Sequence, residues 1–160
     1  IELLRHLRSH YLHVSYERVV SGHGLHAIYD YVRDSKKNEP TWLSEQIKAG
    51  DPPAVIAEAG LKGQADIAKQ ALDLFASIYG AEAGNLALKA MALNGVYLGG
   101  GIAPKLLAKL KDGTFMKAFT NKGRYKRLMT SIPVKVVMND KTALLGAASV
   151  AAALFHTPAA

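Results

Sequence analysis

The stretch from Val96 to Pro104 constrains the fold more than any other part of this chain. Three residues with strand character, Val96-Tyr97-Leu98, run into three consecutive glycines, and Pro104 then opens an apolar segment with helical spacing. This pattern predicts a strand that turns through glycine into the N-terminus of a helix. Free backbone N–H groups and the helix dipole at such a place favour an anionic ligand. The same glycines also suit an ordinary chain reversal, so both interpretations stay open.

Length and composition limit the remaining possibilities. A chain of 160 residues is one ordinary domain or one lobe of a larger enzyme, and it can bury most of its apolar surface. The absence of cysteine excludes disulfides and thiolate chemistry and fits a reducing cytosol. No apolar run approaches the roughly 20 residues that cross a bilayer, so we expect no membrane span. The sequence opens within a helical pattern without an initiating Met, and we therefore expect it to be a fragment.

Charge is distributed unevenly along the chain. Residues 1–100 carry ten Lys/Arg and eleven Asp/Glu, whereas residues 101–160 carry ten and two. A solvated basic face, attraction for a small polyphosphate and a nucleic-acid surface with aromatic stacking are all compatible with this excess. The basic side chains that surround Phe115, Phe119 and Tyr125 are Lys117, Lys122, Arg124, Lys126 and Arg127.

Periodicity predicts a mostly helical chain with two strands. The second strand, 134–138, follows a proline, and the last helix, 142–154, is apolar on almost every side and is expected to lie buried against a sheet. Strand, glycine turn, helix, strand and helix together predict an α/β unit. The expected helices are 1–7, 14–21 with Ser15 as N-cap, 25–33, 52–59, one long or two broken helices within 64–93 near Gly80 to Gly84, and one around Leu106 to Leu110.

Other candidate motifs are weak. Gly22 to Ala27 satisfies G-x-G-x-x-A, but a helix-like segment precedes it, which favours a helix-to-helix turn over a dinucleotide site. His6, His10 and His13 have helical spacing and His23 and His26 are three residues apart, but no carboxylate or thiol completes a metal site with either set. No P-loop motif occurs. On pattern alone, Glu17 beside Arg18 favours an exposed ion pair.

Six blocks of sequence carry a resemblance to a known family. The blocks are His13 to Gly22, Gly84 to Leu88, Gly95 to Pro104, Lys122 to Lys126, Ile132 to Val134 and Leu144 to Gly146. Over essentially the whole chain they resemble, in order, the C-terminal half of the bacterial glucokinases of the hexokinase/actin-like ATPase superfamily. The resemblance implies an α/β fold, the C-terminal lobe of the actin-like ATPase (ribonuclease H-like) fold with a small sheet and many helices, over residues 1–156, followed by a tail or linker at 157–160.

The resemblance also implies a site. Glu17 would hydrogen-bond sugar hydroxyls, and the turn formed by Gly99, Gly100, Gly101 and Ile102 would lie beside the nucleotide. The family's phosphate loop, its catalytic Asn-Asp pair and a further sugar-binding block lie upstream of the residues matched here, so no catalytic base and no metal ligand is expected in this chain. Where relatives have Ser-Gly-Pro-Gly, this chain has His23 in place of the proline.

The implied activity is ATP-dependent phosphorylation of glucose to glucose 6-phosphate, with ATP and Mg²⁺, in the cytoplasm. The 160 residues alone are expected to be inactive. We expect a homodimer and no membrane partner, and nucleic acid is not the expected partner of this lobe. Two alternatives remain: a non-catalytic, sugar-responsive regulator with the same fold, or a glucokinase fused to a helix-turn-helix regulator.

Overall fold

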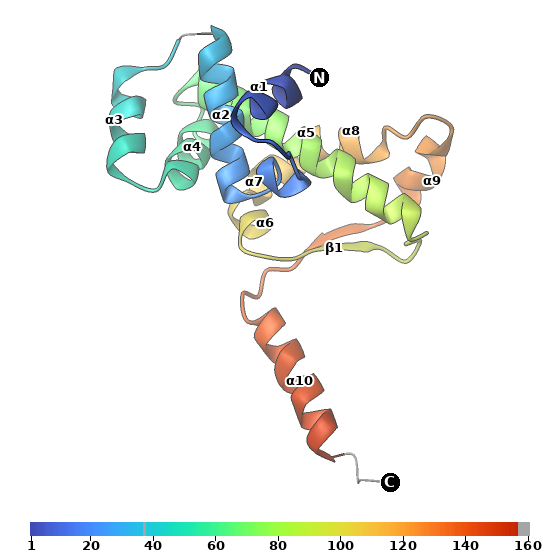
Figure 1. Ribbon diagram of the computed structural model, residues 1–160. Coiled ribbons are helices and arrows are strands. Elements are labelled where there is room, and N and C mark those ends of the chain that lie inside the picture. The colour runs from blue at the N-terminus through green and yellow to red at the C-terminus, as the bar shows by residue number, and fades with distance from the viewer. Residues whose placement is uncertain (37, 157–160) are drawn as a thin grey trace.

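A computed structural model describes residues 1–36 and 38–156, so the predicted tail at 157–160 lies outside the described residues. Helices dominate, and a small sheet lies along one side of them (Figure 1). The helices are α1 (Glu2–His10), α2 (Gly22–Lys36), α3 (Thr41–Ala49), α4 (Pro52–Leu61), α5 (Asp66–Lys89), α6 (Ile102–Lys105), α7 (Leu107–Lys111), α8 (Thr114–Thr120), α9 (Lys126–Ser131) and α10 (Thr142–His156), the 3-10 turns are η1 (Tyr16–Arg18) and η2 (Gly123–Tyr125), and the strands are β1 (Val96–Leu98) and β2 (Val134–Val136).

The long helix α5 organises the core. Its first half packs on α2 and α4, and its second half packs on α8. Gly80 and Gly84 belong to this second half. A Cβ on Gly80 would lie 2.2 Å from the carbonyl oxygen of Phe115, and a Cβ on Gly84 would lie 2.5 Å from that of Phe119. Each glycine costs a helix interior about 1 kcal/mol relative to Ala. Here they allow α8 to approach, and α5 continues through them as one helix.

The sheet confirms the two predicted strands and their parallel pairing. Val96 pairs with Val134 and Leu98 with Val136, so β2 ends two residues earlier than predicted. Leu98 is buried in the core beneath the sheet, while Tyr97 on the other face is exposed. The last residue of β1 is therefore buried, and the glycine turn begins directly after it at the edge of the core.

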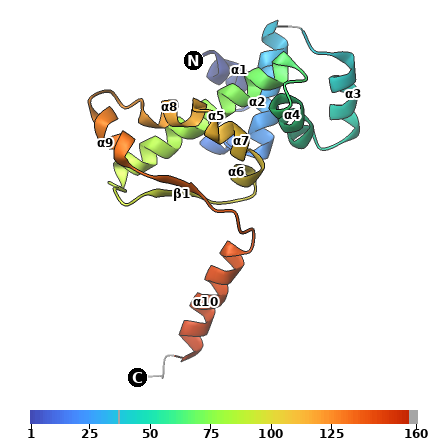
Figure 2. The ribbon, with the colours of Figure 1, turned by 180° about the vertical axis from the view of Figure 1, so that it is seen from behind.

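Helix α10 contradicts the prediction of burial. It stands away from the rest of the molecule in both views (Figures 1 and 2), and the described side chains from residue 142 to 155 are exposed, with Leu144 at 69% and Phe155 at 89%. A helix that is apolar on every side needs another surface to cover it. The described residues provide no such surface. The sequence therefore predicted the helix correctly, but its burial against the sheet is wrong.

The segment before α2 also differs from the prediction. Residues 14–21 form only the single turn η1, and Ser15 makes no side-chain cap, whereas the Oγ atom of Ser21 accepts a hydrogen bond from the Gly24 N–H at 2.9 Å. Gly22 therefore begins α2 instead of ending a helix. Gly24 is required there, because its Cβ would lie 2.5 Å from the carbonyl carbon of Val19. Helices α3, α8 and α9 were not predicted.

Among the described helices, none combines the length and the apolarity that crossing a membrane requires.

Candidate functional site

Glu17 lies in η1 with its carboxylate exposed between two cavities. One, of about 570 Å³, also borders β1 and Gly99, and the other, of about 160 Å³, borders Tyr11 and His23. The expected ion pair with Arg18 is wrong, because the Arg18 guanidinium instead lies over the Tyr11 ring at 4.2 Å from its centroid. No hydrogen bond or ion pair joins Glu17 to any other described residue. Its carboxylate is therefore available to a ligand.

The glycine turn faces open space. A Cβ placed on Gly99, Gly100 or Gly101 would meet nothing within 4 Å. Gly100 has a φ of +94°, which favours glycine, but the other two do not need this conformation. Across the described part of the chain, the three N–H groups donate no backbone hydrogen bond. An ordinary reversal explains Gly100 alone, whereas close approach of a ligand to the backbone explains all three.

A cavity of about 520 Å³ adjoins this turn. It lies between the N-termini of α2 and α4 on one side and Gly101 with Ile102 on the other, and most of its lining is apolar, including Leu25 and Phe75. Lys105 also lines it, and no ion pair or hydrogen bond to another described residue is recorded for this lysine. Asp51 also lines this cavity, at the N-terminus of α4. An apolar wall beside the Gly101 N–H group and the Lys105 ammonium suits a ligand with a flat apolar part and a phosphate that lies on the Lys105 side.

Three lining residues were missed at the sequence level: His23, His26 and Lys105. Lys105 was accessible in principle, since it is the first cation after the glycines, where the charge of the chain changes sign. The two histidines could not be predicted as lining residues, because they share this cavity with residues of α6 that are far away in the sequence.

The structure brings Glu17 and the glycine turn to the same face. Glu17 and Gly99 border one cavity, while Ser21 and His23 border both the small Glu17 cavity and the cavity beside Gly101. The segment around the first turn of α2 thus lies between the carboxylate of Glu17 and the cavity beside Gly101.

A polar network supports the Glu17 side. The Lys122 Nζ donates to the Asn85 Oδ1 at 2.6 Å and to the Ala81 carbonyl at 2.8 Å, and the Asn85 Nδ2 donates to Glu82 at 3.1 Å. The negative charge of Glu82 raises the pKa of the Tyr16 hydroxyl, next to Glu17 in sequence. Burial lowers the pKa of Lys122. The network links η1 to α5 and to the loop after α8.

The basic region does not form a stacking surface. Phe115 and Phe119 are fully buried in the core, and the Lys122 ammonium is engaged with Asn85. Tyr125 is exposed, with the Arg124 guanidinium 5.5 Å from its ring centroid. The nucleic-acid interpretation therefore loses two of its three aromatic residues.

Known proteins resemble this chain over most of its length. The model of the glucokinase family matches residues 1–154. A glucokinase of Synechocystis sp. is 44% identical over 94% of this chain and 46% of its own length, and one of Neisseria gonorrhoeae is 39% identical over 91% and 42%. The crystal structure of a glucokinase from an Antarctic psychrotroph superposes with a TM-score of 0.77 at 31% identity, covering 93% of this chain and 44% of that one.

The chain spans about half the length of the curated relatives it matches. Its mostly helical α/β fold is that of the glucokinase structure. With a family match over 154 of 160 residues, the chain belongs to the glucokinase family.

Proposed function

We propose that the full-length protein containing this chain phosphorylates glucose with ATP to give glucose 6-phosphate, and that these residues supply one side of its active site. The observation that carries the proposal is the pairing of an unengaged carboxylate, Glu17, with the open glycine turn on the same face. The family match and the relatives named glucokinase support the reaction.

Glu17 orients the sugar in this proposal. An ionised carboxylate accepts hydrogen bonds from two hydroxyls, and a hydrogen bond to a charged group contributes about 1.5–3 kcal/mol. With other hydroxyls held this way, the 6-hydroxyl is free to point toward the nucleotide. A site that hydrogen-bonds hydroxyls also discriminates strongly against sugars that lack them, because its own polar group is then left unpaired.

The turn from Gly99 to Ile102 receives the nucleotide. The free N–H groups and the ammonium of Lys105 face phosphate oxygens, and the apolar wall with Phe75 accepts the base. The oxygen of the 6-hydroxyl forms a bond to the γ-phosphorus, the bond from that phosphorus to the bridging oxygen breaks, and ADP leaves. We assign the base that accepts the hydroxyl proton to the part of the family that this chain does not span.

Mg²⁺ would accompany ATP in such a reaction and would neutralise charge that develops on the phosphates. Within the described residues, no group of three or more His, Asp or Glu side chains is arranged to hold a metal ion. We therefore assign no ion-binding role to this chain and treat the ion as part of the nucleotide complex.

Assembly and location complete the proposal. Residues 1–156 form the C-terminal lobe, the protein is cytoplasmic, and it assembles as a homodimer, for which the exposed apolar side chains Leu86, Met91 and Leu93 near the end of α5 are candidates. Light scattering of the full-length protein at tens of micromolar, where an interface of standard size keeps two subunits together, should give twice the mass of one subunit. A single-chain mass would contradict the dimer.

Glu17→Gln in the full-length protein tests the function. The coupled assay for glucose 6-phosphate should show a KM for glucose raised at least about tenfold with the KM for ATP unchanged, because only the sugar contact is weakened. Glu45→Gln, an exposed glutamate on α3, is the matched control. Wild-type glucose dependence in Glu17→Gln would contradict the assignment.

A further inference from the structure

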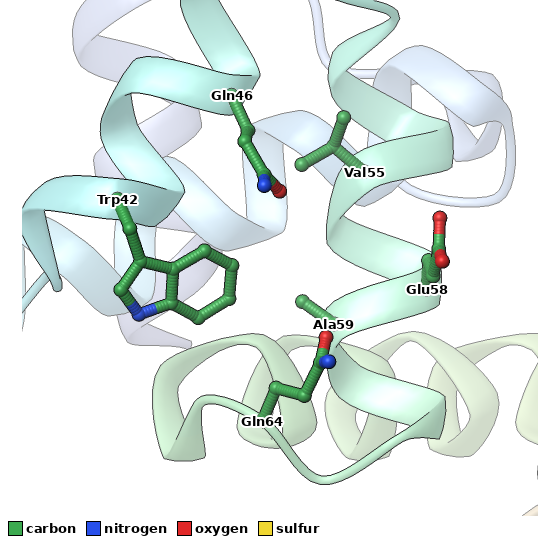
Figure 3. Close-up of a pocket in the computed structure, with 6 residues that line it drawn as sticks. All are labelled: Trp42, Gln46, Val55, Glu58, Ala59 and Gln64. Atoms are coloured by element: carbon green, nitrogen blue, oxygen red, sulfur yellow. The ribbon is translucent and has the colours of Figure 1, made fainter.

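A second cavity of about 520 Å³ lies between α3 and α4, away from Glu17 and the glycine turn. Six residues line it: Trp42, Gln46, Val55, Glu58, Ala59 and Gln64 (Figure 3). Trp42 is the single tryptophan of the chain and remains 37% exposed. The volume of the cavity falls within the range of roughly 300–1,000 Å³ typical of small-molecule sites.

The aromatic wall is positioned by helix geometry. Trp42 and Gln46 are four residues apart on α3, so both project from the same face of that helix. Figure 3 shows the six-membered ring of Trp42 directed toward α4, with the ring nitrogen on the other side. Ala59 on α4 is buried and small, which leaves room in front of the ring. Within a lining that is partly polar, the indole ring and the Val55 and Ala59 side chains form an apolar part that a flat ligand can contact.

Two side-chain amides stand around this surface. Gln46 comes from α3 and Gln64 from the loop after α4, and Figure 3 shows both amides reaching toward the space between Trp42 and Ala59. Within the described residues, neither amide has a hydrogen-bond partner. Each amide group both donates and accepts, which matches hydroxyl groups, since these also do both.

The charge at this cavity is already compensated. Glu58 is the charged residue of the lining, and its Oε1 lies 2.5 Å from the Nζ of Lys62. An approaching cation or anion would have to compete with that pair, so the cavity favours a neutral ligand. A neutral ligand with a flat apolar face and a rim of hydroxyls is a sugar ring.

We propose that this cavity is a saccharide-binding site, in which a pyranose ring lies against Trp42 and its hydroxyls hydrogen-bond to Gln46 and Gln64. It is distinct from the sugar contact proposed for Glu17, and it does not depend on that function. Helix α4 touches both regions, because Pro52 and Ala57 line the cavity beside the glycine turn while Val55 and Ala59 line this one.

The intrinsic fluorescence of Trp42 in the 160-residue chain tests the proposal, since no other tryptophan contributes. Titration with maltose and with glucose should give a saturable change, with half-saturation in the millimolar range expected for a few hydrogen bonds and one ring contact. Sorbitol, which has the hydroxyls of glucose without the ring, should give none. Performing the titration in Glu17→Gln as well separates this site from the proposed catalytic one, and the response should persist there.

Two variants and a control make the test specific. Gln46→Ala and Gln64→Ala should each raise the half-saturating concentration about fivefold, the effect of losing one hydrogen bond of about 1 kcal/mol. Glu45→Ala, beside Gln46 but outside the lining, should bind as the wild type does, and circular dichroism should show unchanged helix content in all three. Three outcomes would overturn the proposal. They are the absence of a saturable response to either sugar, a half-saturating concentration in the two Gln variants equal to that of the wild type, and a response to adenosine but not to maltose.

Discussion

Lys122 donates a hydrogen bond of 2.6 Å from its Nζ atom to the Oδ1 atom of Asn85, joining the loop after α8 to the long helix α5. The stem of the lysine passes over Gly84, whose Cβ would lie 2.8 Å from the Lys122 Cε. Gly84 and Asn85 thus act together: one leaves room for the side chain and the other receives its ammonium. Two separate blocks of the family resemblance are explained by this single contact.

This contact predicts a positioning role. Asn85→Leu removes the acceptor of Lys122 and the donor to Glu82, so Glu82, which interacts with Tyr16 in η1, loses the side chain that holds it in place. In the full-length protein we expect the KM for glucose to rise about threefold to tenfold while the KM for ATP changes less than twofold. Steady-state kinetics with each substrate varied in turn measures this.

Asn121→Leu, at an exposed position beside Lys122, is the matched control. Equal increases in both KM values for Asn85→Leu, together with a lower melting temperature, would show that the network serves stability alone.

The glycine turn gives a second prediction, because its three glycines differ. Gly99→Ala and Gly101→Ala meet open space without a positive φ, so thermal stability should stay within about 0.5 kcal/mol of wild type. If the nucleotide approaches the backbone, the added methyl groups should nevertheless weaken ATP binding about tenfold. Calorimetric titration of ATP and a thermal melt measure the two effects separately.

Gly100→Ala is the comparison, since its φ of +94° makes any side chain there strained. It should lower stability as well as ATP affinity. Unchanged ATP affinity in Gly99→Ala and Gly101→Ala would leave these glycines without a nucleotide role.

A third prediction concerns acid stability. Lys109 is only 8% exposed, and its ammonium pairs with Asp73 and with Asp112. Burial alone would raise the pKa of each carboxyl group, but the hydrogen bond and charge of Lys109, together with Lys69 at Asp73 and Thr114 at Asp112, hold both pKa values below the usual range. Such groups stabilise the fold above the unfolded pKa of about 3.9, and this stabilisation is lost as the pH falls through the lower folded values.

Asp73→Asn should therefore reduce the free energy of unfolding by about 1 kcal/mol at pH 7, near the low end for a charged hydrogen bond because Asp73 is partly exposed. The difference from wild type should shrink toward pH 3. Urea unfolding at both pH values measures it, with Glu45→Gln as a control that should match the wild type throughout. A difference that does not depend on pH would contradict the electrostatic explanation.

Local signals in the sequence predicted the local parts of this structure. Glycine and proline mark the ends of β1 and β2 and the turn after Leu98, because those residues act through their own backbone. Periodicity also predicted α10, but it cannot say which surface covers an apolar helix. The sequence predicts Ser15 as a cap, whereas the Oγ atom of Ser21 accepts the hydrogen bond from the Gly24 N–H, where Gly24 lies close to Val19.

The sequence likewise predicted only part of the candidate site. Glu17 and the glycines came from the family resemblance, and their shared face required the fold. Arg18 pairs with Tyr11 instead of Glu17, a contact between the residue that follows α1 and the end of η1, which depends on how the chain turns between these two elements. His23, His26 and Trp42 were left without a role because each gains its surroundings from another helix.

The last prediction concerns the 160 residues on their own. They supply the proposed sugar contact and nucleotide turn but, in this proposal, no base for the 6-hydroxyl proton. Loss of a general base removes a factor of about 10²–10⁴, and loss of the opposite side of the site also removes the positioning of the two substrates. The coupled assay should therefore detect no glucose 6-phosphate from the purified chain beside an active full-length protein, although the chain should still bind ATP weakly by calorimetry. Turnover within tenfold of the full-length protein would mean that a base lies within these residues, and Glu17 and Glu82, which border one cavity, would be the first to replace.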